Sequence, residues 1–141
     1  MTNKPKEAID MYINTSDAQK ILQASQAKAQ QMGVKVSISV VDGRGDLLTM
    51  VRLDGAPWRT AGVSKGKAVA SANFGVPSAD LLARATSPVM QAFMLSMRGE
   101  FVPAQGAMPV LRNGQVVGAV GVSGAKSEED EEIAKAGIAA L

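Results

Sequence analysis

The sequence predicts an α+β domain in which helices pack against an antiparallel sheet. Four strand-like segments form two pairs, and each pair is joined by a tight turn, at residues 42–46 and at Asn113-Gly114. Segments with helical spacing of apolar residues lie before, between and after these hairpins. Hairpins join antiparallel strands, whereas a doubly wound parallel sheet requires crossover helices. The expected order α-β-β-α-α-α-β-β-α therefore excludes a Rossmann-type sheet.

The domain is expected at residues 15–141, preceded by a flexible and polar arm at residues 1–14. Thr15 or Ser16 is the predicted cap of the first helix, because hydroxyl side chains accept from the free N–H groups of a first turn. Apolar residues at helical spacing continue this helix to about Met32, where a glycine follows.

The first hairpin is expected to join strands at residues 34–42 and 47–54. In the first strand, valine and isoleucine alternate with polar residues, which predicts one buried face and one wet face. The intervening run Asp-Gly-Arg-Gly-Asp has the composition of a turn.

The middle of the chain is expected to hold three helices. The longest runs from Trp58 to about Asn73, and small residues on one side of it predict close approach to the sheet. The stripe assigned to that side is Trp58, Ala61, Gly62, Lys65, Ala68, Val69 and Ala72. A short helix at 79–85 and a Met-rich helix opened by Ser87-Pro88 follow.

The second hairpin is expected to join strands at 107–111 and 115–123. A two-residue Asn113-Gly114 turn would pair Arg112 with Gln115 and Val110 with Val117. Ser127 is then the predicted cap of the last helix, with Asp130 in the position of a capping-box acid.

Composition excludes several classes of function. The chain has no cysteine and no histidine, which rules out disulfides, a Ser-His-Asp triad and a histidine metal site, and no metal site is expected. The net charge is +2 with scattered Lys and Arg and few aromatic residues, so nucleic acid is not an expected partner. No run approaches the roughly 20 apolar residues of a membrane span, and no secretory signal is evident, so a cytoplasmic location is expected.

Two glycine-containing motifs fail as nucleotide sites. The run 62–68 lacks P-loop spacing and the Ser or Thr that should follow Lys67. Gly118, Gly121 and Gly124 recur every three residues on an antiparallel strand, which favours close packing over ligand approach. Close packing and ligand approach are compatible, because Ser123 and Gly124 lie beside the start of the last helix, where N–H groups can receive an anion.

Several charged residues are candidates for a polar site. Arg52 and Asp54 share one face of the second strand, and Lys67 lies on the flank of the next helix. Arg52 and Lys67 could converge on a carboxylate; equally, the strand face could be wet and the lysine solvated. Asp130 is either a cap or an acid whose pKa is raised by burial.

The sequence resembles the GlcG/HbpS family, which includes the carboxy-terminal domain of PduO-type proteins, from about Thr15 to Leu141. The segments that carry the resemblance are 39–42 with Gly45, 52–56, 64–68, 73–78, 106–110, 114–124 and 129–131. The resemblance implies a profilin-like fold with about five strands, one of them hidden near Phe101, and a homo-oligomer. Some members bind haem. Because histidine is absent here, haem would depend on Tyr12, a methionine, a lysine or a hydroxyl, with Arg or Lys on its propionates.

Three hypotheses follow. The first is a binding module for haem or another carboxylated ligand, without an obligatory cofactor; its proposed contacts are Tyr12, Arg52, Lys67, Ser123 and Gly124. The second is a metal-independent enzyme that hydrolyses or isomerises an imine or semialdehyde acid of aromatic or organic-acid catabolism. Its proposed catalytic residues are Asp54, Lys67 and Asp130, with Arg52 and Lys67 on the carboxylate. The third is an assembly protein whose interface is the Met-rich face at 89–97.

Overall fold

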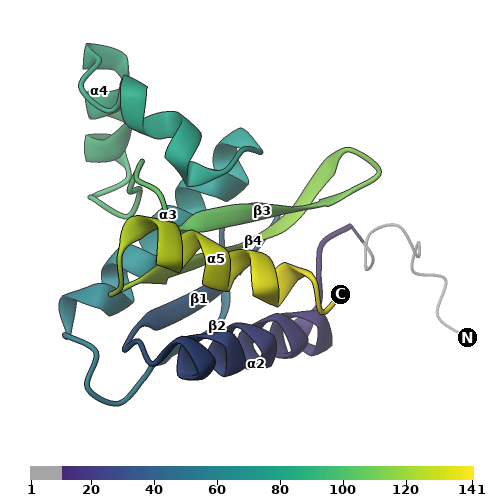
Figure 1. The fold of residues 1–141 in the computed structure, drawn as a ribbon. Coiled ribbons are helices and arrows are strands. Elements are labelled where there is room, and N and C mark those ends of the chain that lie inside the picture. The colour runs from purple at the N-terminus through teal and green to yellow at the C-terminus, as the bar shows by residue number, and fades with distance from the viewer. Residues whose placement is uncertain (1–10) are drawn as a thin grey trace, which may run out of the picture.

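The structure, a computed structural model, describes residues 11–141 and has three layers (Figure 1). One antiparallel sheet with strand order β2-β1-β4-β3 lies between α3 on one face and α2 with α5 on the other. The elements are α2 (Thr15–Met32), β1 (Ser37–Asp42), β2 (Leu47–Arg52), α3 (Arg59–Phe74), the 3-10 helix η1 (Ser78–Arg84), α4 (Pro88–Ser96), β3 (Ala107–Arg112), β4 (Gln115–Ser123) and α5 (Ser127–Ile138). The predicted α+β class and antiparallel sheet are confirmed.

The expected strand count is wrong for the described residues, which form four strands rather than five. The segment near Phe101, where a fifth was expected, is irregular, and its ring is buried against Phe93 and Phe74 with centroids 4.9 and 5.7 Å away. This aromatic cluster lies under η1 and α4, which project beyond the sheet (Figure 1). The profilin-like likeness stays a prediction.

The second hairpin shows the predicted turn but a different register beyond it. Arg112 pairs with Gln115 as expected, whereas Val110 pairs with Gly118 rather than Val117. A bulge opposite Val110 and Leu111 places one extra residue in β4, so every pair farther from the turn is shifted by one residue.

The α2/α5 face of the sheet carries the main hydrophobic core. Branched side chains of β1 and β4 pack there against apolar residues of both helices, including Ile38, Val40, Val120, Val122, Ile21 and Ile133. Burying each such side chain contributes about 1.5–3 kcal/mol relative to exposure. No helix among residues 11–141 is long and apolar enough to cross a bilayer.

At the two central strands, the α3 face of the sheet is buried and carries mainly small and hydroxyl side chains. Ser37 and Ser39 of β1 are buried and hydrogen-bond to Thr60 at 2.8 Å and Ser64 at 2.7 Å. The predicted wet face is therefore wrong, because hydroxyl pairs satisfy the buried serines. A side chain at Gly121 would collide with the Ser64 carbonyl, so the glycine permits the close approach of α3.

The predicted stripe of α3 is right in its second half, where Ala68, Val69 and Ala72 are buried, and wrong in its first half, where Trp58, Ala61, Gly62 and Lys65 are not. The side that meets the sheet carries Thr60, Ser64 and Lys67, whereas Trp58 is 82% exposed on the outer flank. Apolar periodicity failed here because hydroxyl side chains fill the buried positions.

Two helix starts differ from the expectation. Asn14 caps α2, accepting from the Asp17 N–H at 2.8 Å, and Lys126 precedes α5 as its cap residue. Ser87-Pro88 opens α4 as predicted, and the Ser87 side chain caps it. Residues 1–10 of the predicted arm lie outside the described residues, and Ile13 is buried with its N–H bonded to the Val117 carbonyl.

Candidate functional site

Lys67 and Asp130 form a buried ion pair at one end of the sheet. Lys67 is 6% exposed and Asp130 is 2% exposed. Lys67 Nζ donates to Asp130 Oδ2 at 3.3 Å and to the Val122 carbonyl oxygen at 3.0 Å. The pair thus links α3 on one face of the sheet to α5 on the other.

The Val122 carbonyl accepts from Lys67 because the β3–β4 ladder ends beside it. The Val122 N–H donates to the Gly106 carbonyl at 2.9 Å, but the Gly106 N–H returns no bond. Gly106 has φ 141°, and a Cβ there would lie 2.7 Å from Lys67 Nζ. Glycine is therefore required both for this backbone conformation and for the approach of the ammonium.

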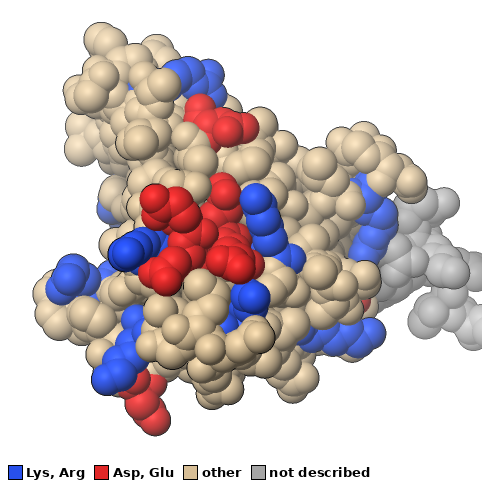
Figure 2. Space-filling model, in the orientation of Figure 1, with Lys and Arg blue, Asp and Glu red and all other residues tan. Residues whose placement is uncertain are grey.

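Asp130 anchors the start of α5 from inside the protein. Its Oδ1 accepts from the Ala125 N–H at 3.0 Å, and the predicted capping-box role falls instead to Glu129, which accepts from the Lys126 N–H at 3.1 Å. Acidic side chains gather over this end of the helix (Figure 2), as suits its positive dipole end. Burial raises the pKa of Asp130 above its ordinary value of 3.8, against the opposing effects of the Ala125 N–H and Lys67.

Ser123 and Gly124 adjoin this pair. Ser123 is buried opposite Ser37 of β1, and its hydroxyl has no hydrogen-bond partner among the described residues. Gly124 has φ 131°, and a Cβ there would lie 2.6 Å from the Lys35 carbonyl oxygen. Close packing thus accounts for Gly124, as the recurrence of glycines on β4 predicted.

Arg52 and Asp54 are exposed at the edge strand β2, where Arg52 pairs with Ser37 of β1. Arg52 Nη1 donates to the Ala56 carbonyl at 2.9 Å. Both residues line a groove of about 280 Å³ beside Gln26 and Gln30 of α2. The structure gives Arg52 no polar partner or cavity in common with Lys67, so it does not bring together the two cations that were expected to share a carboxylate.

Tyr12 lines a cavity of about 440 Å³ at the opposite end of the sheet from Lys67. The Ile13 N–H bond to Val117 fixes the chain here, and the Tyr12 ring lies directly against Gly43. The cavity is lined by Met11, Tyr12, Gly43, Arg112, Asn113, Gln115, Val116 and Val117. The Tyr12 hydroxyl has no partner within residues 11–141, and Arg112 has a long 3.9 Å contact with Asp17. A phenol, a thioether and a guanidinium therefore face one cavity.

The outer flank of α3 carries two more cavities, which sequence reasoning missed. Their volumes are about 370 and 260 Å³, and both are lined by Lys65 and Glu100, whose side chains form an ion pair at 3.3 Å. The signal that could have found the smaller one is Trp58, the single tryptophan, which lines it and was assigned to the buried side. Neither cavity, nor the two at Arg52 and Tyr12, is lined by Lys67, Ser123, Gly124 or Asp130.

Comparisons with known proteins agree on one family. Residues 13–139 match the family model "Haem degrading protein HbpS-like". The chain is 35% identical to Protein GlcG of Escherichia coli K12 over 112 residues, covering 75% of this chain and 77% of GlcG. The crystal structure of Klebsiella pneumoniae protein ORFY superposes with a TM-score of 0.84 at 27% identity, covering 99% and 96% of the two chains. The crystal structure of a PduOC–haem complex superposes with a TM-score of 0.81 at 25% identity, covering 92% of this chain and 95% of that one.

Proposed function

This chain belongs to the HbpS-like family, and from that premise we propose that it binds haem, or a similarly flat carboxylated ring, in the Tyr12 cavity. The proposal makes the protein a ligand-binding module that works without histidine. It draws on the haem complex of a structural relative and on the chemistry of the residues that line this cavity.

The observation that carries the proposal is the set of side chains around the Tyr12 cavity. Its volume of about 440 Å³ is within the range of roughly 300–1,000 Å³ typical of small-molecule sites. Tyr12 and Met11 bring a phenol and a thioether, and Arg112 brings a cation suited to a carboxylate. The Tyr12 hydroxyl has no other partner in the described part of the chain, so it is available to a ligand.

These residues fit haem. A phenolate and a thioether are both known axial ligands, so the absence of histidine from the sequence does not exclude an iron porphyrin. Tyr12, with Met11 as the alternative, would hold the iron, and Arg112 would hold a propionate. When bound, haem would supply redox and small-ligand chemistry; the protein would contribute its binding and orientation.

A hemin titration tests this proposal directly. We expect a saturable Soret band at one hemin per chain, and we expect Tyr12→Phe to shift the band and weaken binding at least tenfold. Met11→Leu is the matched control, because it removes the other ligand atom while keeping the apolar volume. A featureless titration that never saturates would refute haem binding; a normal band in Tyr12→Phe would refute the assigned ligand.

Lys67 and Asp130 support a second candidate function, the metal-independent enzyme acting on an imine or semialdehyde acid, with Asp54 as the alternative acid. A buried carboxyl with a raised pKa beside a lysine is typical of acid–base sites. We rank this function second because neither Lys67 nor Asp130 lines a described cavity. Unchanged turnover of such acids in Arg52→Ala and Lys67→Ala would eliminate it.

We also propose that the protein is a homo-oligomer, formed through the projecting η1–α4 region. Leu82, Val89 and Leu95 are exposed there, which is unusual for three large aliphatic side chains close in sequence. Light scattering should give a mass above that of one chain, and Val89→Lys with Leu95→Lys should lower it. A cytoplasmic location and a role in catabolism stay predictions.

A further inference from the structure

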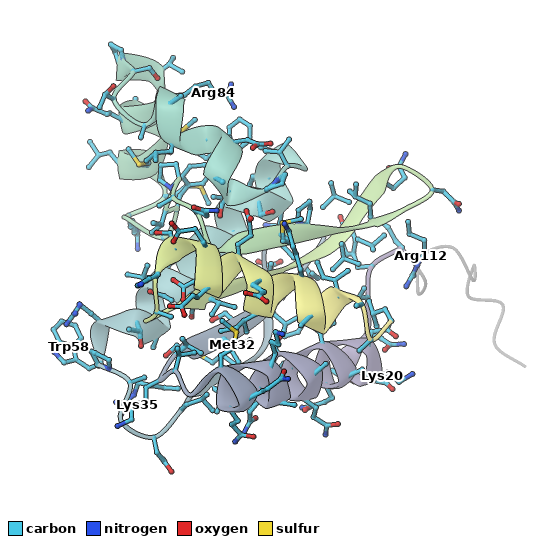
Figure 3. All side chains as sticks on the ribbon, viewed as in Figure 1. Lys20, Met32, Lys35, Trp58, Arg84 and Arg112 are labelled. Atoms are coloured by element: carbon cyan, nitrogen blue, oxygen red, sulfur yellow. The ribbon has the colours of Figure 1, made fainter. Side chains whose placement is uncertain are left out.

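The outer flank of α3 carries a small open cavity that the proposed function does not use. Its volume is about 260 Å³, and we name it the Trp58 shelf after the residues Trp58, Arg59, Gly62, Val63, Lys65 and Val102. Trp58 is 82% exposed at its edge. Figure 3 places Trp58 and Arg112 on opposite sides of the molecule, so the shelf is separate from the Tyr12 cavity.

Gly62 lines the Trp58 shelf with bare backbone. Gly62 lies inside α3, where glycine is less favourable than alanine, and a Cβ on it would meet nothing within 4 Å. By contrast, a Cβ on Gly66, one turn later, would lie 2.5 Å from Val102 Cγ2. Packing therefore explains Gly66 but not Gly62. Because Trp58 and Gly62 are four residues apart, the indole and the bare backbone lie on the same side of the helix.

The charges around the shelf favour an anion. The Arg59 side chain makes no hydrogen bond or ion pair within residues 11–141, and it lies in the first turn of α3, at the positive end of the helix dipole. Lys65 lies on the same rim and forms an ion pair with Glu100, which also lines the cavity and is its one carboxylate. The rim thus holds two cations and one carboxylate beside an exposed indole face.

We propose that the Trp58 shelf is a second ligand site, which binds a single-ring aromatic carboxylate. The ring would stack on Trp58 above Gly62, and the carboxylate would meet Arg59 and Lys65. The cavity lies just below the usual range for drug-sized ligands, which suits one ring rather than a porphyrin. Aromatic stacking supplies the apolar contact, and the two cations select the anion.

The single tryptophan makes this site directly measurable. We would titrate the ¹⁵N-labelled full chain with benzoate and follow the one indole Nε1–H signal, with emission excited at 295 nm as a second readout. Cyclohexanecarboxylate keeps the charge without the flat ring, and benzyl alcohol keeps the ring without the charge. We expect saturable shifts with benzoate and at least tenfold weaker binding of both analogues.

Variants separate this site from the rest of the molecule. Gly62→Leu should fill the shelf and abolish saturable binding, while Gly62→Ala, its matched control, should bind within a fewfold of the original protein. Neither should impair folding, because both replace a helical glycine by a better helix former and the Cβ of either meets nothing within 4 Å. Arg59→Gln should weaken benzoate about tenfold, and Lys20→Gln on the remote helix α2 should not.

Three results would overturn the proposal. They are a linear, non-saturating shift, saturable binding that persists in Gly62→Leu, and an indole signal that moves on dilution without ligand. The last would show that a second copy of the chain covers Trp58 instead. Hemin binding at Tyr12 is read separately from the Soret band in Gly62→Leu, so failure of either site leaves the other tested.

Discussion

Both ends of the sheet carry polar side chains, but these are buried and paired at one end and open to a cavity at the other. At one end, Lys67 and Asp130 are buried, and their polar atoms bond to each other, to Val122 and to the Ala125 N–H. At the other, Tyr12 and Arg112 line an open cavity. The difference indicates that the first end stabilises the fold, whereas the second retains bonding capacity for a ligand.

Backbone geometry explains why one end is closed. Gly106 and Gly124 bring backbone against Lys67 and Lys35, and Lys67 and Asp130 line none of the four cavities described above. At the other end, the hairpin of β3 and β4 runs out beyond the helices (Figure 1), so one wall of the Tyr12 cavity faces solvent. The comparison can be tested at each end separately.

The largest effect is expected from Asp130→Ala at the closed end. It leaves the Lys67 ammonium buried without a counter-charge, which should lower the free energy of unfolding by about 3–5 kcal/mol. Urea unfolding followed by circular dichroism measures this. The matched control is the double variant Lys67→Met with Asp130→Leu, which removes both charges and should recover most of the loss. A loss under about 1 kcal/mol for Asp130→Ala would mean that water reaches the ammonium.

The next effect is expected from Gly43→Ala at the open end. The new methyl group would collide with the Tyr12 ring and approach the Val116 carbonyl, so we expect a loss of about 1–3 kcal/mol. It should also displace Tyr12 and weaken hemin binding. Gly114→Ala at the nearby hairpin turn is the control: its φ of 75° strains any side chain while its Cβ meets nothing within 4 Å, so it lowers turn stability without a collision. Equal hemin affinity in Gly43→Ala and the original protein would show that the position of Tyr12 does not matter.

The hairpins were predictable because their signals are local. Asn113-Gly114 determines a turn by its own backbone preferences, and the structure has it. The bulge after Val110 has no comparable signal and shifted the predicted register. The fifth strand was expected from family resemblance alone, and the aromatic packing of Phe101 replaces it in this chain.

The polar side of α3 was missed because two distant patterns had to be read together. Ser37 and Ser39 alternate along β1, and Thr60 and Ser64 are four residues apart on α3. Both sets can be buried only because each β1 serine hydrogen-bonds to an α3 hydroxyl. Lys67 and Asp130 are separated by 63 residues and nothing local marks them as partners. Candidate residues could therefore be chosen only one at a time, Arg112 was not among them, and their grouping into a closed and an open end required the fold.

A smaller effect, on binding alone, is expected from Arg112→Gln. The guanidinium is half exposed and only weakly engaged by Asp17, so the free energy of unfolding should change by less than about 0.5 kcal/mol. Hemin affinity should fall about tenfold, or roughly 1.4 kcal/mol, through loss of a charge-assisted contact with a carboxylate. Isothermal titration calorimetry measures the hemin affinity of the variant and of the original protein. Arg44→Gln is the control, because Arg44 lines a different cavity. A stability loss matching the affinity loss would place Arg112 in the fold rather than the site.

The smallest effect is expected from pH at the closed end, because Lys67 and the Ala125 N–H offset part of the desolvation that raises the pKa of Asp130. A raised native pKa means that the folded protein holds this proton more firmly than the unfolded chain does. The resulting stabilisation is fully present below the ordinary value of 3.8 and is lost as pH rises through the native pKa. Unfolding free energies of the original protein and Asp130→Asn, measured from acid to neutral pH, isolate this group, because asparagine does not titrate. The original protein should lose stability relative to Asp130→Asn as pH rises through that window; a gain would mean that the attraction of Lys67 outweighs burial and that the closed end is wetter than its packing indicates.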